Sequence, residues 1–280
     1  MNPEAEHDAR IMRRLNEHLL CFRESFANEW VGIFLQGSQN YGLDYEDSDI
    51  DTKVIVLPSF EDIVFNRKPV STTLVMPNDE HVDVKDIRLM FECFRKQNIN
   101  FVEILFTKYF ILNPEYAALF RPLMKVREAI GRYNNYAAVS CMAGMVWEKR
   151  KSLTKPHPSA AGVVEKYGYD GKQLHHMERI LEFYIKYAAG EPYSKCLRSS
   201  RRDELIALKR HCLPLEDALR RADEIVETMN AFADDYRANN PLNVSGETER
   251  VLNQTLADIL RHAFRRELIT EDRPKGEDRA

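Results

Sequence analysis

The chain has 280 residues, 44% hydrophobic and 30% charged, a composition that suits one large or two smaller globular domains and excludes a disordered or fibrous protein. No run approaches the roughly 20 apolar residues that span a bilayer, and the opening MNPEAEHDARIMRR has charges where a signal peptide has its apolar core, so we expect a cytoplasmic protein with no membrane partner. The net charge of −4 disfavours a protein that coats nucleic acid by bulk charge, and five cysteines without CxxC spacing indicate neither a disulfide framework nor a zinc site.

The first elements follow from apolar spacing. Apolar residues at steps of three and four predict an amphipathic helix over residues 8–26. An apolar run over 31–35 then meets Gly37 and Ser38, and this junction predicts a strand, a tight turn and a short helix. A glycine lets the backbone approach a ligand, and a helix start offers unpaired N–H groups to an anion such as a phosphate.

A second extended run begins at Ser48 and carries Asp49 and Asp51. Side chains at i and i+2 of a strand share a face, so these carboxylates would stand about 7 Å apart. Carboxylates this close repel unless a cation lies between them, and beside phosphates that cation is usually Mg²⁺. The alternative is that both are solvated turn or strand-edge residues.

The pair Gly37-Ser38 followed by Asp49-Ile50-Asp51 resembles the signature of the DNA polymerase β-type nucleotidyltransferase superfamily. The fuller strings GSQNYGL and SDIDTK are closer to predicted nucleotidyltransferases of bacteria and phages that include an RNA-repair-associated branch. The resemblance implies an α+β, polymerase β-like domain with a small mixed sheet, NTP as substrate and Mg²⁺ or Mn²⁺ as cofactor. It also implies a nucleotide site that includes Gly37, Ser38, Asn40, Tyr41 and Ser48.

A hairpin follows the two strands. Pro58 closes the second strand, and Ser59 can cap a helix that runs to residue 65. Residues 69–75 and 80–85 then form two predicted strands, joined by the turn-rich tripeptide Pro77-Asn78-Asp79.

A polymerase β-type site needs a third carboxylate from a neighbouring strand, and the hairpin offers four candidates: Asp79, Glu80, Asp83 and Asp86. In HVDVKD, Val82 and Val84 fill one face while Asp83 occupies the other, so Asp83 is the preferred third metal ligand. Asp86 is instead expected as the N-cap of a helix over 87–96. Asp79 and Glu80 are expected in the turn as solvated residues, although Glu80 and Asp86 remain the fallback ligands.

The second half has helical periodicity almost throughout, after a helical stretch over 100–106 and a break at Asn113-Pro114. The predicted helices cover residues 120–130, 133–151, 173–189, 202–212, 214–239 and 248–268. We therefore expect a nucleotidyltransferase domain over 1–113, a helical domain over 114–270 that completes the nucleotide cleft, and a flexible tail over 271–280. The segment 155–171 is expected to be a long, glycine- and proline-containing loop with a functional role.

One cationic constellation stands out in the helical half. Lys172, His176 and Arg179 follow one another at i, i+4 and i+7, so a helix would place all three on one face. Such a stripe suits a triphosphate, although charged stripes are more often solvated surface. The predicted nucleotidyltransferases carry a similar Tyr-Asp-x-Lys-x-x-x-His-x-x-Arg string, which favours the binding interpretation. His175, Tyr167 and Tyr169 are expected to pack.

Other residues leave further interpretations open. The segment with Arg198, Arg201 and Arg202 could contact an RNA backbone, but a solvated helix start is the preferred interpretation. A GxSxG nucleophile elbow and a Walker A loop are both absent from the sequence.

The predicted function is metal-dependent transfer of a nucleoside monophosphate from an NTP, with Asp49, Asp51 and Asp83 holding two Mg²⁺ ions. The acceptor stays open: an RNA end, a protein side chain or a small molecule. The alternative is a nucleotide-binding regulator with a silent site. The oligomeric state is not predicted.

Overall fold

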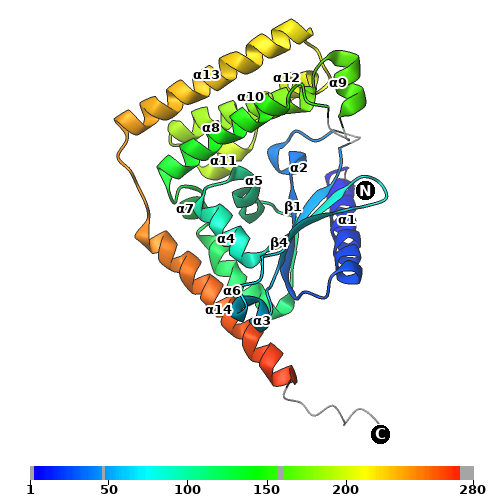
Figure 1. The fold of residues 1–280 in the computed structure, drawn as a ribbon, viewed down its shortest axis with the longest axis vertical. Helices are drawn as coiled ribbons and strands as arrows, with labels where there is room; N and C mark the ends of the chain where they lie inside the picture. Colours follow the sequence, from blue (N-terminus) through cyan, green and yellow to red (C-terminus); the bar gives the residue numbers. More distant parts are fainter. Residues whose placement is uncertain (1–2, 46–47, 157–159, 272–280) are drawn as a thin grey trace.

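The fold combines one small sheet with many helices (Figure 1), and the computed structural model describes residues 3–45, 48–156 and 160–271. The sheet is mixed and has the strand order β3-β4-β2-β1-β5. Its strands are β1 (Trp30–Gln36), β2 (Asp51–Val56), β3 (Ser71–Val75), β4 (His81–Asp86) and β5 (Phe110–Leu112). The expected α+β fold class, with the sheet in the first half of the chain and helices dominating the second, is confirmed.

Pairing directions place the site strands at the centre of the sheet. The central strand β2 pairs with β1 in antiparallel and with β4 in parallel, and β3 and β4 form the predicted antiparallel hairpin. The parallel register sets Lys53 opposite Asp83. Because side chains alternate along a strand, Asp51, Lys53 and Ile55 share one face of β2, while Val54 and Val56 lie on the other.

The two faces of the sheet are covered by different helices. Helix α1 (Pro3–Ser25) buries Leu19 and Phe22 against Ile33, Val54 and Val56. Helix α4 (Ile87–Arg95) and helix α6 (Pro114–Lys125) belong to the larger core on the opposite face, which contains Val31, Phe34 and Ile55. The strand β1 contributes to both cores because its side chains alternate between the faces, with Ile33 in one core and Phe34 in the other.

Short helices punctuate the first half as local capping predicts. Ser59 caps α3 (Phe60–Val64) in a capping box with Asp62, and Asp86 caps α4 by accepting a hydrogen bond from the Arg88 N–H at 2.8 Å. The prediction that Asp86 is the N-cap of this helix is therefore confirmed. The other short elements are α2 (Ser38–Tyr41), α5 (Ile99–Val102), the 3₁₀ helix η1 (Glu103–Leu105) and α7 (Arg127–Gly131).

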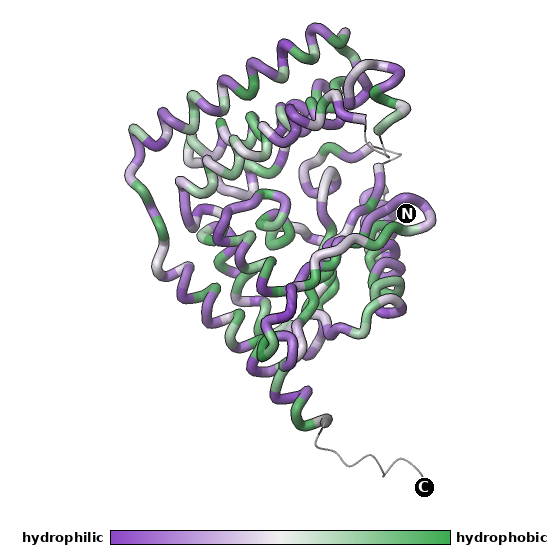
Figure 2. The backbone as a smooth tube through the Cα atoms, in the orientation of Figure 1, coloured by the Kyte–Doolittle hydropathy of each residue, from purple (hydrophilic) through white to green (hydrophobic). Residues whose placement is uncertain are grey.

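The second half consists of packed helices, shown from green to red in Figure 1. They are α8 (Asn135–Ser152), α9 (Ala161–Tyr167), α10 (Gly171–Ala188), α11 (Tyr193–Leu197), α12 (Arg202–Lys209), α13 (Leu215–Asn239) and α14 (Gly246–Glu271). Helix α10 is central and is buried along most of its length, with α8, α11, α12 and α13 packed around it. Figure 2 shows mixed polar and apolar colour along the peripheral α13.

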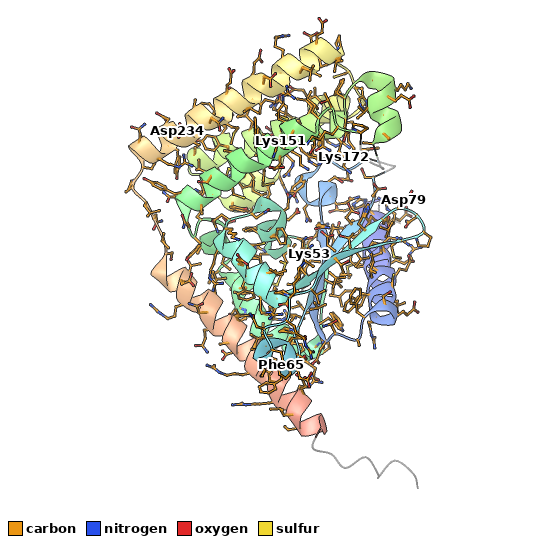
Figure 3. All side chains as sticks on the ribbon, in the orientation of Figure 1. Lys53, Phe65, Asp79, Lys151, Lys172 and Asp234 are labelled. Atoms are coloured by element: carbon orange, nitrogen blue, oxygen red, sulfur yellow. The ribbon has the colours of Figure 1, made fainter. Side chains whose placement is uncertain are left out.

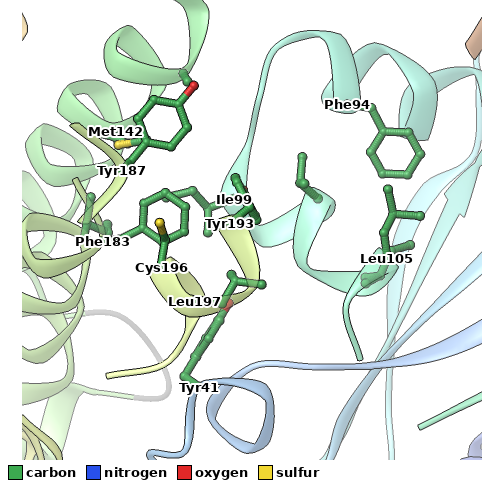
Figure 4. Close-up of a cluster of buried hydrophobic side chains, with 14 of the residues drawn as sticks. Tyr41, Phe94, Ile99, Leu105, Met142, Phe183, Tyr187, Tyr193, Cys196 and Leu197 are labelled. Carbon is green, nitrogen blue, oxygen red and sulfur yellow. The ribbon is translucent and has the colours of Figure 1, made fainter. Parts of the chain in front are cut away.

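One apolar core joins the sheet half to the helical half. Figure 4 shows Tyr41, Phe94, Ile99 and Leu105 from the first half near Met142, Phe183, Tyr187 and Tyr193 from the second. Helix α14 returns to the first half, where Phe264 packs edge-on against Phe60 and Arg266 pairs with Glu29 at 2.8 Å. The domain boundary near residue 113 stays a prediction. Apolar side chains from both sides of that position share one continuous core.

Four details of the predicted elements are wrong. The second strand begins at Asp51 and not at Ser48, and a short strand, β5, follows the helical turn of 99–105 because it completes the sheet beside β1. The segment 155–171 contains α9, so it is not a structureless loop, although residues 157–159 lie outside the described residues. Helix α14 extends to Glu271, and the rest of the expected tail, 272–280, also lies outside them.

Two expectations about composition can be compared with the described residues. The five cysteines there are free thiols. Among the helices that the structure describes, we find none with the length and apolar character needed to cross a membrane.

Candidate active site

Asp51 opens β2 beside the hairpin. Its Oδ1 accepts a hydrogen bond from the backbone N–H of His81 at 3.0 Å and lies 3.2 Å from Nδ1 of the same residue. The side chain is one-third exposed, at 33%, so one carboxylate edge is available to a ligand. The strand start thus fixes Asp51 to the neighbouring strand and leaves it open to solvent.

Asp49 precedes the strand and is exposed. Burial, and next the negative charge of Asp51, raise the pKa of Asp49, whereas Lys172 and Lys209 oppose that shift. In the part of the chain that the structure describes, no donor is hydrogen-bonded to its carboxylate. The charge of Asp51 therefore acts on Asp49, and no lysine or arginine among the described residues forms an ion pair with either carboxylate, while the metal site predicted for the two stays a prediction.

Glu80 holds the residue between these two carboxylates, Ile50, in place. The prediction that Glu80 is a solvated residue of the turn is wrong. The side chain is only 7% exposed because it packs under α1, where it accepts hydrogen bonds from Arg14 and from His18 Nε2 at 2.9 Å. Its other oxygen accepts the backbone N–H of Ile50 at 3.2 Å. Burial would raise the pKa of Glu80, but the hydrogen bonds of Arg14, Asn78 and His18 lower it.

Asp83 lies on β4, on the face away from α1, as the alternation predicts. Its Oδ2 is 3.1 Å from Lys53 Nζ and accepts from Gln36 Nε2 at 3.2 Å, and its Oδ1 accepts from Thr73 Oγ1 at 2.6 Å. Burial would raise the pKa of Asp83, but the Lys53 charge and these bonds lower it. Both oxygens therefore have partners within the protein.

Gly37 makes the predicted tight turn at the end of β1. Its φ of +87° lies in the region that strains other residues. Its N–H faces both carboxylate oxygens of Glu103 at 3.4 Å, and Asn40 reaches the same carboxylate at 3.3 Å. Burial raises the pKa of Glu103 to about 7, against opposing effects from Tyr41, Arg179 and Asn40. The predicted phosphate-binding turn at Gly37 therefore lies next to the carboxyl group of Glu103, whose pKa is about 7.

Arg179 of α10 lies across from this turn. Only 4% of it is exposed, its guanidinium lies 4.0 Å above the Tyr41 ring, and its Nε and Nη1 have no hydrogen-bond partner among the described residues. Buried polar nitrogens normally find partners, and leaving them unsatisfied costs roughly 1–3 kcal/mol or more each. Arg179 is therefore arranged to receive a ligand from the cavity it borders.

Two further helix residues stand near Arg179. Lys149 of α8 is half-buried, and burial followed by the charges of Lys172 and Arg179 lowers its pKa. Burial and then the charges of Arg179, Lys149 and Lys172 hold the pKa of His176 well below its usual value. The sequence prediction of a three-cation stripe is corrected here, because His176 is neutral near pH 7 unless an anion binds.

A cavity of about 310 Å³ brings the two sides together. Six of the residues that line it are site residues predicted from the sequence: Gly37, Tyr41, Asp51, Asp83, His176 and Arg179. Residues that the sequence analysis did not select also line it: Gln36, Lys53, Lys85, Asn100, Phe101, Glu103, Met145, Lys149 and Ile180. Figure 3 marks Lys53 on the sheet and Lys172 on α10.

The remaining predicted residues lie around the cavity and not in its wall. Ser38 starts α2, Asn40 also donates to the Leu35 carbonyl at 3.0 Å, and buried Ser48 accepts from the Tyr45 N–H at 2.9 Å. These bonds hold the turn and the loop. Lys172 is exposed at the start of α10, where its charge acts on Asp49.

The residues outside the site behave as packing or surface groups. His175 bonds the Leu205 carbonyl at 2.8 Å, Tyr169 is buried, and Tyr167 stacks on His211 with ring centroids 4.2 Å apart. Arg201 pairs with Glu178 at 3.0 Å, and Arg202 donates to the Asp44 carbonyl at 2.6 Å. These bonds are intramolecular, and the choice between a solvated helix start and an RNA contact for the basic segment stays a prediction.

The carboxylates fit a metal unequally. Within residues 3–45, 48–156 and 160–271, the structure gathers no group of three His, Cys, Asp or Glu side chains in position to hold a metal ion. Mg²⁺ commonly takes one or two carboxylates and completes its shell with substrate phosphates and water. The Asp49–Asp51 pair fits that requirement, and the predicted role of Asp83 as a third ligand stays a prediction.

A second cavity, of about 570 Å³, lies at the other end of the sheet between α14 and the start of α3. Its charged residues include Glu29, Asp62, Arg266 and Glu267. It is larger, but it contains neither Gly37 nor Asp51, which both line the smaller cavity, whereas Asp49 lines neither of the two. We therefore place the candidate active site at the smaller cavity.

Comparison with known proteins adds little to this geometry. No family model and no curated protein matches the chain. One solved structure that it resembles is a nucleotidyltransferase-like protein from Exiguobacterium sibiricum 255-15, with 10% identity over 92% of each chain and a TM-score of 0.32. At that TM-score the likeness carries no argument about this chain.

Proposed function

We propose that the chain is a metal-dependent nucleotidyltransferase that binds an NTP in the cavity between the sheet and helices α8 and α10. The observation that carries the proposal is Arg179, a buried guanidinium whose Nε and Nη1 lack hydrogen-bond partners among the described residues and which borders the cavity that contains Gly37 and Asp51. An anionic ligand would satisfy those donors. Lys149 and His176 lie at the same wall, so a chain of phosphates would meet several donors.

The residues divide the proposed reaction between them. Asp49 and Asp51 would hold Mg²⁺ or Mn²⁺, which when bound supplies Lewis-acid polarisation of the phosphate and stabilises developing charge. Arg179 and Lys149 would orient the triphosphate and neutralise the pyrophosphate that leaves. The acceptor hydroxyl oxygen would form a bond to the α-phosphorus while the bond from that phosphorus to the β-phosphate bridging oxygen breaks, and the hydroxyl proton passes to solvent.

The acceptor is proposed by resemblance alone, as an RNA end. Protein side chains and small molecules are the other acceptors to test. The test supplies each α-³²P-labelled NTP with Mg²⁺ or Mn²⁺ to RNA, to the protein alone and to cell extract. Label on one acceptor class in a metal-dependent reaction supports transfer. Tight NTP binding without any labelled acceptor would instead favour the nucleotide-binding regulator.

A further inference from the structure

Lys53 is a buried cation built into the wall of the active-site cavity. It is 2% exposed, its Nζ lies 3.1 Å from Asp83 Oδ2, and the ammonium also lies 4.3 Å from the centre of the Phe101 ring. The two residues are register partners on the parallel strands β2 and β4, so the pairing is fixed by the backbone. Lys53 therefore stands two residues beyond Asp51 on the same strand face. Burial lowers the pKa of Lys53, and the charge and hydrogen bond of Asp83 oppose that shift and favour the ammonium form.

Both carboxylate oxygens of Asp83 already have partners within the protein in this arrangement. One oxygen receives Lys53 and Gln36, and the other receives Thr73 at 2.6 Å. A divalent cation bound to Asp83 would displace the Lys53 ammonium or stand beside it. Either result leaves a buried positive charge without full compensation, and breaking a buried ion pair by removing one partner is strongly unfavourable.

The Asp49–Asp51 pair presents the opposite situation. Its carboxylates repel each other, and no lysine or arginine among the described residues forms an ion pair with either of them. Of the two carboxylates on the sheet side of the cavity, Asp51, whose neighbour Asp49 precedes the strand outside the cavity wall, therefore calls for a cation, and Asp83 is already neutralised by a lysine. A two-metal site holds two cations. Here one of them would be a metal ion and the other the ammonium group of Lys53.

Building on the proposed function, we propose that this active site takes one divalent cation, at Asp49 and Asp51, and that Lys53, held by Asp83, replaces the second metal as a fixed cation facing the phosphates. Asp83 is then a positioning residue for Lys53 and not a metal ligand. The substrate class is unchanged, a nucleoside triphosphate, but the metal requirement is half of that predicted from the sequence.

Native mass spectrometry of the full chain with Mn²⁺ and a non-hydrolysable NTP analogue tests the proposal by counting ions. The expected complex of wild type contains one analogue and one Mn²⁺. Asp83→Asn should keep that count, because its carboxylate is not a ligand. Lys53→Met should raise the count to two, because it removes the ammonium that pairs with Asp83 and keeps an unbranched side chain only one atom shorter.

Lys85→Met is the matched control, since Lys85 also lines the cavity but bonds Ser71 and not Asp83. It should keep one Mn²⁺. Two ions in wild type and one in Asp83→Asn would overturn the proposal, and the wild-type count decides even where a variant does not fold. If wild type binds no analogue, the proposed function fails and this proposal fails with it; two ions overturn only the present proposal.

Discussion

The two walls of the cavity are organised in opposite ways. On the sheet side, Asp83 and Lys53 neutralise each other through a cross-strand pair, and Asp51 is bonded to the neighbouring strand. On the helix side, Arg179 is buried with two nitrogens unpartnered among the described residues. The sheet wall therefore sets positions through internal bonds, while the helix wall keeps binding capacity for a ligand. Substitutions on the two walls should therefore separate metal-dependent transfer, which depends on the sheet side, from nucleotide binding, which depends on the helix side.

The largest expected effect is on the sheet side. Asp49→Asn or Asp51→Asn should lower label transfer by at least about a hundredfold, since a bound metal contributes several kcal/mol to the transition state and each 1.36 kcal/mol is tenfold. The melting temperature without metal should stay equal or rise, because the repulsion that raises the pKa of Asp49 is relieved. A large fall in melting temperature with transfer retained would show that the pair is structural.

Arg179→Met sharpens the contrast from the helix side. Loss of charge-assisted bonds worth about 1.5–3 kcal/mol should weaken NTP binding roughly tenfold to a hundredfold. The free energy of unfolding should change by less than about 1 kcal/mol, because the lost attraction to Tyr41 is offset by removal of unsatisfied nitrogens. Calorimetric titration and thermal melts measure the two effects.

Lys186→Met is the matched control for Arg179→Met on the same helix. Lys186 bonds Glu182 at 2.7 Å and the Arg198 carbonyl at 2.6 Å, so it already has partners within the protein. This variant should lose stability and keep NTP affinity. The reverse pattern in the two variants would contradict the assignment of Arg179.

The pH dependence of stability tests the raised pKa of Glu103, the carboxyl group next to the Gly37 turn. Glu103 has a pKa of about 7 in the fold against an ordinary value of 4.5, so between those pH values the folded state holds a proton that the unfolded state has lost. Stability from this group is therefore full below pH 4.5 and is lost as pH rises towards 7, by up to about 3 kcal/mol. Denaturant unfolding of wild type and Glu103→Gln should diverge over that window, and parallel profiles would refute the assignment.

The smallest expected effect is that of Lys172→Ala. The residue is exposed and does not line the cavity, so the free energy of unfolding should change by less than about 0.5 kcal/mol. NTP affinity should fall far less than in Arg179→Met. An equal fall in both variants would mean that the phosphates extend along the whole predicted stripe.

Local patterns were enough to predict the sheet wall. Alternation along HVDVKD placed Val82 and Val84 in the core and Asp83 on the cavity face, and Asp86 at the N-cap follows from its position before an apolar helix. The same patterns could not reveal the Lys53–Asp83 pair, because it depends on the parallel register of β2 and β4. One feature of the sequence could have selected Lys53. It follows Asp51 by two residues, so strand alternation places both side chains on the same face.

Tertiary packing determined the rest. Glu80 looks like a turn residue in sequence, but α1 covers it with Arg14 and His18. Glu103 lies in an apolar helical segment that gives no reason to place it under Gly37. Helical spacing correctly put Arg179 and His176 at one wall, yet burial and mutual repulsion, which no spacing reports, decide that His176 is neutral.

The most direct test of the account follows two labels through one reaction. An NTP labelled in parallel samples at the α- or the γ-phosphate is incubated with Mg²⁺, the acceptor found above, and either wild type or Asp51→Asn. Nucleotidyl transfer at this cavity predicts that wild type puts α label on the acceptor and γ label in pyrophosphate, and that Asp51→Asn does neither. Label from the γ-phosphate on the acceptor, or undiminished α transfer by Asp51→Asn, would contradict it.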